Sequence, residues 1–347
     1  MKTTTKVLLS LSFIFIGLGA IGLLWGERTG GLEDIQKATA PTSIRKDISS
    51  FKDLELDLTS HDVIIQPSED QNWHLSYYND DKMLGKLDVT QSGDSLSLKQ
   101  DSKETIVTGT ISILGFYLNS QTKDYADIVI SVPKDTTLDN LTGFSGRSVE
   151  LYALKLDNID LTADYVTTDD VHIAKGKVSP RTLHLTNSSA DKLNITDYDY
   201  LSMINSNLKN SQLETNYGDF DMDKGLLQNV TMKHDDSALS LKNVELDNVS
   251  LSGEYNSLSS NNLRLKNLID ISNAYSAIDI NLAKEGRGST NFNLKVTDSE
   301  LTVSDDLSES TQITSTDQNT VHQFTKQVKN NTATLTISNK EGEITVK

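Results

Sequence analysis

Four tyrosines recur at almost equal spacing and are the side chains best suited to bind a ligand. The gaps from Tyr198 to Tyr217 and from Tyr255 to Tyr275 both correspond to a period of about 20 residues, and Asp236 lies midway between Tyr217 and Tyr255. An aromatic column along one flank of a repeating structure could bind sugar rings or peptidoglycan. The same column could be a stacked ladder that only stabilises the repeats. Both interpretations stay open, and we expect any ligand-binding residues among these four tyrosines.

Acidic residues are the second group with possible chemistry. Asp219, Asp221 and Asp223 alternate along a predicted strand, so they share one face, where they could gather a cation or simply face water. No Asp-x-Asp-x-Asp-Gly loop of the calcium-binding type occurs. Three acidic pairs have the character of solvated turns or faces: Asp169–Asp170, Asp235–Asp236 and Asp305–Asp306. The carboxylates therefore predict no metal site.

The other polar residues form no recognisable catalytic arrangement. No two of the 6 histidines have metal-ligand spacing, although His172 and His184 could converge on adjacent coils. Nucleophile-elbow, His-Glu-x-x-His and phosphate-loop motifs do not occur. A polysaccharide lyase or hydrolase would need Asp, Arg or Lys clustered on one face, whereas the arginines are scattered. The sequence predicts no catalytic residues and no cofactor, so we do not expect an enzyme.

The tyrosines mark a repeat of about 20 residues that also contains apolar pairs. Extending the spacing backwards reaches Tyr165 and Gly146, although the stretch between Tyr165 and Tyr198 is irregular. The period predicts stacked coils with two short strands each, in which every strand pairs with its equivalent in the next coil. We therefore predict an all-β, β-solenoid-like stack, and a β-sandwich or propeller is the alternative. The apolar pairs precede the aromatic positions: Val230 and Met232, Val249 and Leu251, Ile269 and Ile271.

The predicted stack covers residues 138–307. Residues 44–137 alternate as strands with polar turns and predict an N-terminal β region, which includes an extended apolar stretch at 105–118. Residues 308–347 predict a C-terminal β cap around a KEGE turn. Because the ends of a stack are open sheet edges that invite aggregation, both flanking regions could cover them.

The N-terminus carries a membrane signal. Residues 7–25 are free of charge, and 19 residues at about 1.5 Å each span roughly 28 Å, close to a bilayer core of about 30 Å. Lys2 and Lys6 precede this run, which places residues 1–6 in the cytoplasm and the rest of the chain outside. We predict a single-pass anchor followed by a juxtamembrane spacer at 26–43. A cleaved signal peptide is the alternative.

Composition limits the possible partners. Lys plus Arg is 32 against 49 Asp plus Glu, which gives a formal net charge of −17. That charge repels the phosphate backbone of nucleic acids and favours basic partners. The chain has no cysteine, which excludes disulfides, thiolate zinc sites and cysteine nucleophiles. The lipid bilayer is an expected partner only through the N-terminal helix.

Two segments and the repeats carry a resemblance to a known family: DLELDLTSHDVIIQPSED, DIVISVPKDTTLDNL and repeats ending in Gly/Asn-x-Ile-x-Ile units. Together they resemble the putative-adhesin, LiaG-like family of β-strand repeat proteins of Gram-positive bacteria, over nearly everything after Ile44. The resemblance implies a membrane-anchored extracytoplasmic protein of a family often associated with envelope stress responses. No catalytic residues come with that family. This chain departs from it in using Asn, Asp or Tyr at many turns where Ser-Gly is expected.

These observations predict a non-catalytic, exported, membrane-anchored protein of the bacterial cell envelope. Its rigid stack would offer an acidic face to a cationic peptide or to an envelope protein such as a membrane sensor. A surface adhesin is the first alternative, disfavoured because about seven coils at about 4.8 Å reach only roughly 35 Å from the membrane. A carbohydrate-active β-helix enzyme is the second alternative, and it would need a carboxylate cluster in one groove.

Overall fold

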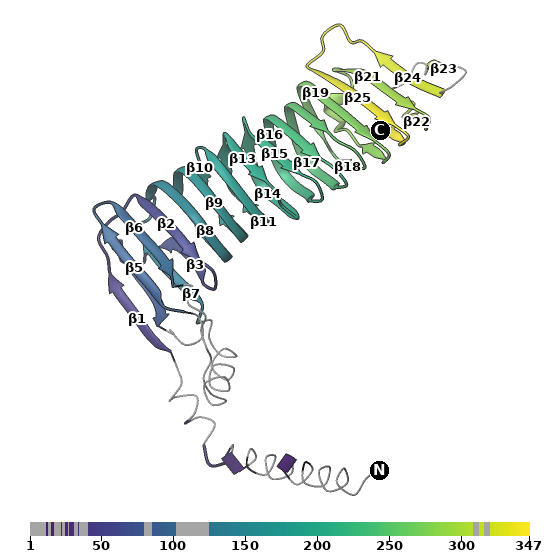
Figure 1. Ribbon diagram of the computed structural model, residues 1–347. Coiled ribbons are helices and arrows are strands. Elements are labelled where there is room, and N and C mark those ends of the chain that lie inside the picture. The colour runs from purple at the N-terminus through teal and green to yellow at the C-terminus, as the bar shows by residue number, and fades with distance from the viewer. Residues whose placement is uncertain are drawn as a thin grey trace, which may run out of the picture.

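The computed structural model describes residues 41–79, 85–101, 125–307, 312–315 and 320–347, together with a few scattered residues between 12 and 34. The predicted anchor at 7–25 lies mostly outside the described residues, and so do the spacer and the apolar stretch at 105–118. Among the described residues, no helix is both long and apolar enough to cross a membrane. The described part of the chain is all-β, and its strands stack mainly in parallel (Figure 1).

Strands occupy most of the described chain. The N-terminal strands are β1 (Thr42–Asp47), β2 (Asp53–Leu58), β3 (Asp62–Pro67), β4 (His74–Asn79), β5 (Leu87–Ser92), β6 (Ser95–Gln100) and β7 (Asp127–Val132). The middle strands are β8 (Thr137–Tyr152), β9 (Lys155–Asp169), β10 (His172–Ile173), β11 (Gly176–Thr186), β12 (Ser189–Asp191), β13 (Leu193–Thr196), β14 (Tyr200–Lys209), β15 (Gln212–Thr215), β16 (Asp219–His234), β17 (Ala238–Ser252), β18 (Ser257–Asn261), β19 (Arg264–Ala274) and β20 (Ile278–Ile280). A short helix, α4 (Lys284–Arg287), then precedes β21 (Thr290–Thr297), β22 (Leu301–Val303), β23 (Gln312–Ser315), β24 (Thr320–Lys326), β25 (Ala333–Lys340) and β26 (Ile344–Val346).

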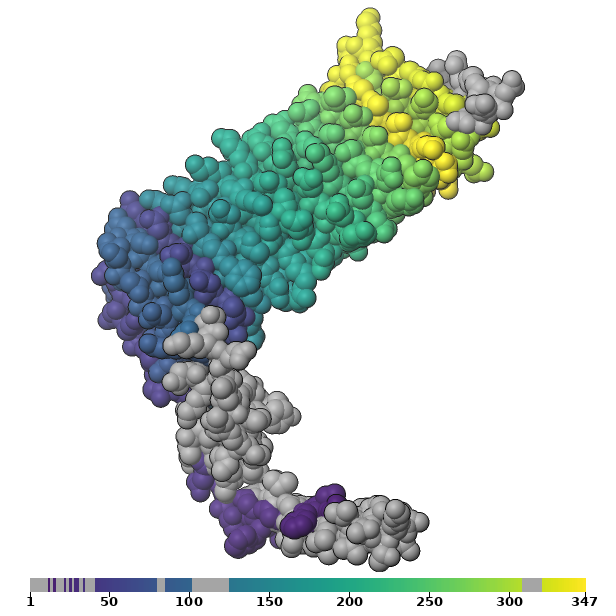
Figure 2. Space-filling view, in the orientation of Figure 1, coloured from purple at the N-terminus to yellow at the C-terminus, as the bar shows by residue number. Residues whose placement is uncertain are grey.

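Two long sheets run along the stack. Sheet 1 begins with β1, β4, β7 and β3, continues through parts of β8, β9, β11, β14, β16 and β17, and ends with β18, β20, β26 and β22. Sheet 2 begins with β5, β6 and β2, continues through parts of β8, β9 and β11, then through β13 and β15, then through parts of β16 and β17, and ends with β19, β25, β21, β24 and β23. From β8 to β20 the coils follow one another in sequence order along the molecule, as the colours of Figure 2 show. At the ends the order changes: β2 and β3 lie between β8 and the strands β6 and β7, and β25 and β26 lie between β19 and β20 on one side and β21 and β22 on the other.

Each coil also has a short third side, which the sequence did not predict. In the coil of β16 and β17 the chain turns at left-handed residues, among them Lys224, Asn229 and Asp236. The segment between Lys224 and Asn229 comprises only residues 225–228, and Leu227 is the one of these residues that is fully buried. Such a segment is too short for its apolar alternation to stand out, so the prediction of two strands per coil was wrong.

The register also corrects the predicted spacing at the start of the stack. Tyr165 lies opposite Thr182, and Thr182 lies opposite Tyr200. Tyr165 therefore belongs to the row of Tyr200, not to that of Tyr198. By this pairing the two coils here are shorter than the coil from Tyr200 to Asp219, the first by two residues and the second by one. Gly146 lies within a register shift between Ser145 and Ser148, which explains why it does not fit the spacing either.

The core is built from inward-pointing rows in which each apolar side chain lies above its equivalent in the previous coil. One such row in sheet 1 is at most 4% exposed at every position, so it is closed to water along its whole length. Burial of this kind contributes roughly 25 cal/mol per Å² of apolar surface. The row consists of Leu201, Phe220, Leu239, Leu258, Ile278 and Ile344.

Asparagine ladders hold the corners in register. Asn210, Asn229 and Asn248 all have positive φ, between 50° and 58°, a conformation that Asn tolerates better than most residues. The Asn248 amide donates to the Asn229 carbonyl oxygen at 2.8 Å, and the Asn229 amide donates to Asn210 at 2.8 Å. Asn210 continues the ladder to Asp191 at 2.6 Å. This explains why the repeat can use Asn where Gly would be expected.

Replacing Asn229 with alanine is expected to lower the free energy of unfolding by about 2 kcal/mol, from left-handed strain and two lost side-chain hydrogen bonds. Asn229→Gly also removes the two hydrogen bonds, but glycine adopts the left-handed conformation without strain. The free energy of unfolding should therefore fall by about half as much as in Asn229→Ala. Urea unfolding followed by circular dichroism would measure both. Equal losses in the two variants would show that the backbone conformation at this corner carries no cost.

Candidate functional site: the tyrosine corner

Counted back from the start of sheet 1, the four tyrosines of the sequence prediction fall at equivalent positions in the stack. The pairing of Tyr200 with Asp219 sets Tyr198 against Tyr217, and the pairing of Ala238 with Ser257 sets Asp236 against Tyr255. The pairing of Leu258 with Ile278 then sets Tyr255 against Tyr275. These positions follow one corner of the stack, at the end of sheet 2 and the start of sheet 1.

Tyr198 is turned into the core, unlike the other three. Its side chain is 1% exposed, and its hydroxyl oxygen lies 2.7 Å from Nε2 of His234. Tyr198 directly follows the left-handed residue Asp197, as the buried Ser237 and Asn256 follow the left-handed residues of their coils. The residue that directly follows the left-handed residue therefore points its side chain into the core. Tyr198 offers no surface to a ligand.

The other three tyrosines are exposed. Tyr217 is 76% exposed, Tyr255 53% and Tyr275 37%. The rings of Tyr255 and Tyr275 stack with centroids 4.8 Å apart and planes 19° apart, and the Lys340 ammonium lies 5.6 Å from the centre of the Tyr275 ring. A stacked pair is thus present in part of the column, while Tyr217 presents its ring to solvent. We call Tyr217, Asp236, Tyr255 and Tyr275 the tyrosine corner.

Two of these aromatic residues have an uncommon backbone conformation. The φ of Tyr255 is 58° and that of Tyr275 is 67°, within the left-handed region that bulky residues rarely adopt. Holding a non-glycine residue there costs about 1–3 kcal/mol, and such strain clusters at functional sites. The conformation directs both rings away from the core, since each residue is itself the turning residue.

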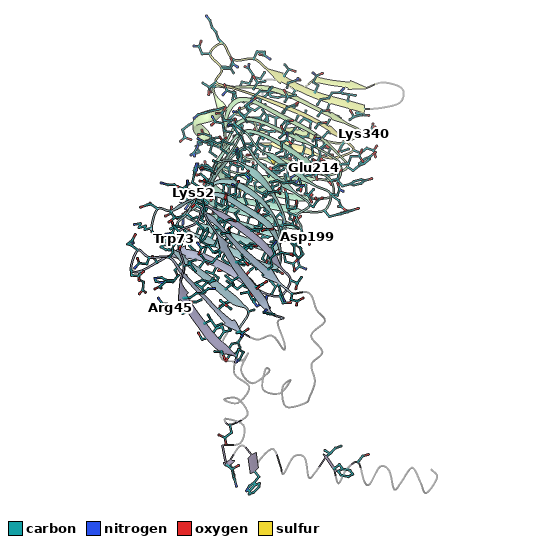
Figure 3. The ribbon with its side chains drawn as sticks, turned by 60° about the vertical axis from the view of Figure 1, so that its left-hand side comes forward. Arg45, Lys52, Trp73, Asp199, Glu214 and Lys340 are labelled. Carbon is teal, nitrogen blue, oxygen red and sulfur yellow. The ribbon has the colours of Figure 1, made fainter. Side chains whose placement is uncertain are left out.

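Carboxylates surround the tyrosine corner. Asp235, Asp236 and Glu254 are exposed, and the backbone N–H of Glu254 donates to Asp235 at 2.8 Å. None of the three makes an ion pair with a residue that the structure describes. Figure 3 shows Asp199, Glu214 and Lys340 along one edge of the molecule, the edge that the corner follows. The corner therefore combines exposed rings with unneutralised negative charge.

The acidic strand predicted by alternation is engaged within its own sheet. Asp219 accepts a hydrogen bond from the Ala238 backbone at 2.8 Å, and Asp221 accepts one from the Tyr200 hydroxyl at 2.8 Å. Asp223 accepts from Asn243 at 3.1 Å, and this bond lowers the pKa of Asp223. Within the described ranges, no group of three or more His, Cys, Asp or Glu side chains is arranged to hold a metal ion.

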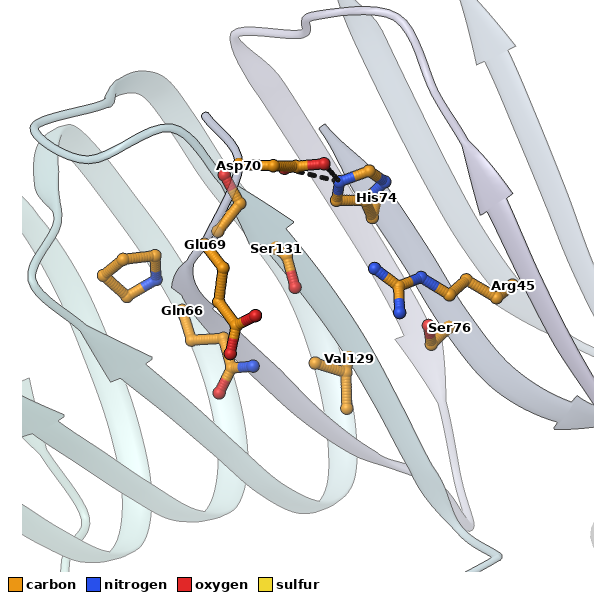
Figure 4. A pocket seen from close by; sticks show the side chains of 10 residues that line it. Arg45, Gln66, Glu69, Asp70, His74, Ser76, Val129 and Ser131 are labelled. Carbon is orange, nitrogen blue, oxygen red and sulfur yellow. Dashed lines mark hydrogen bonds and ion pairs between the residues drawn. The ribbon is translucent and has the colours of Figure 1, made fainter. Parts of the chain in front are cut away.

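One charged cluster was not predicted from the sequence. At the N-terminal end of sheet 1, His74 Nδ1 lies 2.8 Å from Asp47 and Nε2 lies 2.8 Å from Asp70 (Figure 4 shows the Asp70 side). The two carboxylates raise the pKa of His74, and the bond to His74 lowers the pKa of Asp70 to about 2. The Asp70–His74 spacing is visible in the sequence. Asp47 reaches His74 only because β1 pairs with β4.

Comparison with known proteins places the chain in a family. Residues 51–347 match the family model described as Toastrack DUF4097, which is most of the chain and the whole of the stack from Phe51 onward. The chain belongs to the Toastrack DUF4097 family. That membership confirms the broader part of the resemblance, a β-repeat family of unknown function. A comparison of this Toastrack chain with curated proteins finds no match.

Three solved structures show a distant likeness to the Toastrack chain. A "putative adhesin" from Bacteroides fragilis is 13% identical, with a TM-score of 0.28, over 68% of this chain and 98% of that one. A "putative cell adhesion protein" from Clostridium sporogenes is 11% identical, with a TM-score of 0.19, over 89% and 99%. A "putative lipid binding protein" from Parabacteroides distasonis is 14% identical, with a TM-score of 0.28, over 88% and 96%.

Proposed function

We propose that this Toastrack protein is a non-catalytic, LiaG-like, membrane-anchored β-solenoid of the cell envelope that binds a cationic segment at its tyrosine corner. The segment would belong to an envelope protein or to a cationic peptide, in an envelope-stress response. The single observation that carries the proposal is that the exposed ring of Tyr217 shares one corner of the stack with Asp235, Asp236 and Glu254, none of which makes an ion pair within the described residues.

The chemistry of the corner favours lysine and arginine side chains. A cation over an exposed tyrosine ring gains about 0.5–1 kcal/mol, and several such contacts along one row would add together. The neighbouring carboxylates add attraction that salt weakens, because exposed charges are screened beyond about 10 Å at 0.1 M ionic strength. The Lys340 ammonium beside Tyr275 is an example of the same contact within the chain.

The proposed location follows from the N-terminal sequence. The charge-free run at 7–25 is long enough to cross a bilayer, and Lys2 and Lys6 favour a cytoplasmic N-terminus. The stack would then stand outside the cell, fixed to its membrane. A formal net charge of −17 suits capture of a basic partner in that compartment better than contact with nucleic acid.

The test is binding of a fluorescent lysine-rich peptide to the full chain in detergent, measured by anisotropy at low and high salt. Tyr217→Ala should weaken binding about two- to fivefold, and high salt should weaken it further. Tyr165→Ala is the matched control, because Tyr165 is also exposed but its hydroxyl already accepts a hydrogen bond from Arg181 at 2.8 Å. Equal effects of the two substitutions, or binding that salt leaves unchanged, would contradict the proposal. Retention of host matrix proteins in place of the peptide would favour the adhesin alternative.

A further inference from the structure

A cavity of about 350 Å³ opens at the end of sheet 1 that is far from the C-terminus. Its floor consists of Val129 and Ser131 of β7 and Ser76 of β4, which Figure 4 shows beneath the charged side chains. One wall is Arg45 of β1, and the opposite wall is the loop after β3, which carries Glu69. The volume is at the lower end of the range of about 300–1,000 Å³ found for small-molecule sites.

The two walls carry opposite charges that nothing in the described chain neutralises. Arg45 and Glu69 are both exposed, and neither makes an ion pair or side-chain hydrogen bond with any residue that the structure describes. In Figure 4 both side chains extend into the space above the floor. Fixed opposite charges on two walls of one cavity suit a small molecule that carries both charges itself.

Ser68 supplies a second, independent observation. It lies in the same wall as Glu69 and is only 6% exposed. Its buried hydroxyl has no hydrogen-bond partner within the described ranges. Buried hydroxyls are usually hydrogen-bonded, so an unpaired one in the wall of this cavity is uncommon.

His74 fixes both walls at once. Asp47 is two residues after Arg45 on β1, and Asp70 directly follows Glu69. His74 contacts both carboxylates at 2.8 Å, so one imidazolium holds the edge strand and the loop at a set separation. Both ring nitrogens can donate to a carboxylate only when the ring is protonated. The other charged groups that line the cavity are Arg45 on β1 and Glu69 in the loop. The strands β3 and β7 contribute only uncharged residues to it: Gln66, Pro67, Val129 and Ser131.

We propose that this cavity binds a small zwitterion bearing a carboxylate and an ammonium group, of the kind found in a free amino acid or a dipeptide. Arg45 pairs with the carboxylate of the ligand and Glu69 pairs with its ammonium group. His74 is a positioning residue that holds the two walls. This site is separate from the tyrosine corner and does not depend on the function proposed there.

The probe is alanyl-alanine, titrated calorimetrically into the full chain at pH 6. N-acetylalanine keeps only the carboxylate and alaninamide keeps only the ammonium group, so each should bind at least tenfold more weakly. Arg45→Gln and Glu69→Gln should each weaken alanyl-alanine binding at least tenfold without changing the melting temperature, since neither side chain has a partner in the described chain. Lys347→Gln and Asp279→Asn are matched controls that neutralise an ion pair of 3.6 Å at the other end of the same sheet.

Measuring the affinity at several pH values in the native chain and in His74→Gln separates the effect of His74 titration from the effect of ligand titration. Because the carboxylates raise the pKa of His74, its positioning effect is complete below pH 6.5 and is lost as the pH rises through that higher value. Affinity should therefore fall more steeply with pH in the native chain than in His74→Gln, while titration of the ligand is the same in both. No saturable binding, equal binding of the three probes, or unchanged affinity in Arg45→Gln and Glu69→Gln would each overturn the proposal. Parallel pH profiles would overturn the role of His74.

Discussion

Acidification from about pH 6.5 to pH 4 is expected to cost the stack about 3 kcal/mol of its free energy of unfolding through one residue, His234. Its ring is 1% exposed, and desolvation lowers its pKa from 6.5 to about 4. The unfolded chain therefore binds a proton in this window that the native chain excludes. The loss begins as the pH falls below 6.5 and is complete near pH 4, where the native ring also becomes protonated.

The contacts of His234 explain why protonation is so unfavourable. Nε2 has the Tyr198 hydroxyl at 2.7 Å, whereas Nδ1 is buried with no partner among the described residues. In the protonated ring both nitrogens carry a hydrogen and the ring is charged. The N–H at Nδ1 would then have no hydrogen-bond acceptor, which is costly for a charged group in the core. The stacked aromatic position that seemed suited to a ligand is, at Tyr198, part of this buried pair.

Urea unfolding at several pH values would measure the effect. His234→Gln should be less stable at pH 7 but should lose about 3 kcal/mol less than the native chain between pH 6.5 and pH 4. His172→Gln is the control, because His172 is exposed and contacts Ser189 at 2.9 Å on the surface. Native and His234→Gln curves that stay parallel across the window would exclude His234 as the cause.

Gly225→Ala is expected to destabilise the middle of the stack by about 3 kcal/mol or more. The φ of Gly225 is 131°, and a Cβ atom there would lie 1.9 Å from the carbonyl oxygen of Ser206 in the preceding coil. That oxygen belongs to backbone that pairs with Gly225 in sheet register, so neither partner can move away without breaking the row. Alanine would therefore separate two coils as well as strain its own backbone.

Thermal unfolding followed by circular dichroism would test this expectation against a matched glycine. Gly288 has no atom within 4 Å of an added Cβ and no positive φ, so Gly288→Ala should change the free energy of unfolding by less than about 0.5 kcal/mol. Similar melting temperatures for the two variants would contradict the close approach of the coils at Gly225.

The sequence predicted the stacked all-β architecture because the later coils are regular. From Tyr198 to Tyr275 the period of about 20 residues matches the strand register, and apolar alternation marks the buried rows. The prediction failed between Tyr165 and Tyr198, where the coils are shorter and the anchor row changes. When a coil is one or two residues shorter, apolar and polar residues still alternate within each strand. Every residue after the shorter coil is nevertheless displaced from the position that a constant period predicts.

The candidate sites were harder to predict because side-chain direction depends on a single backbone conformation. Tyr198 and Tyr217 fill the same position in successive coils, yet one is 1% and the other 76% exposed. Tyr198 directly follows the left-handed residue Asp197, whereas no residue from Thr215 to Gly218 has a positive φ, and sequence spacing does not reveal this difference. The cavity walls come from Arg45 and Glu69, which no periodic pattern connects, because β1 returns beside β4 only in the folded sheet.

The stack has its two ends far apart, with β1 at one and β22 and β23 at the other (Figure 1). A pulling force between these ends would act across the strands, so it would load the hydrogen bonds of one coil at a time. Once the strands at an end have detached, each middle coil is held by its neighbours alone, so the coils from β8 to β20 would detach one after another. Each release of about 19 residues would free roughly 60 Å of extended chain while the rest stays folded. Stretching a single molecule should therefore give a series of small, nearly equal steps, and the protein would lengthen under tension without losing its remaining coils.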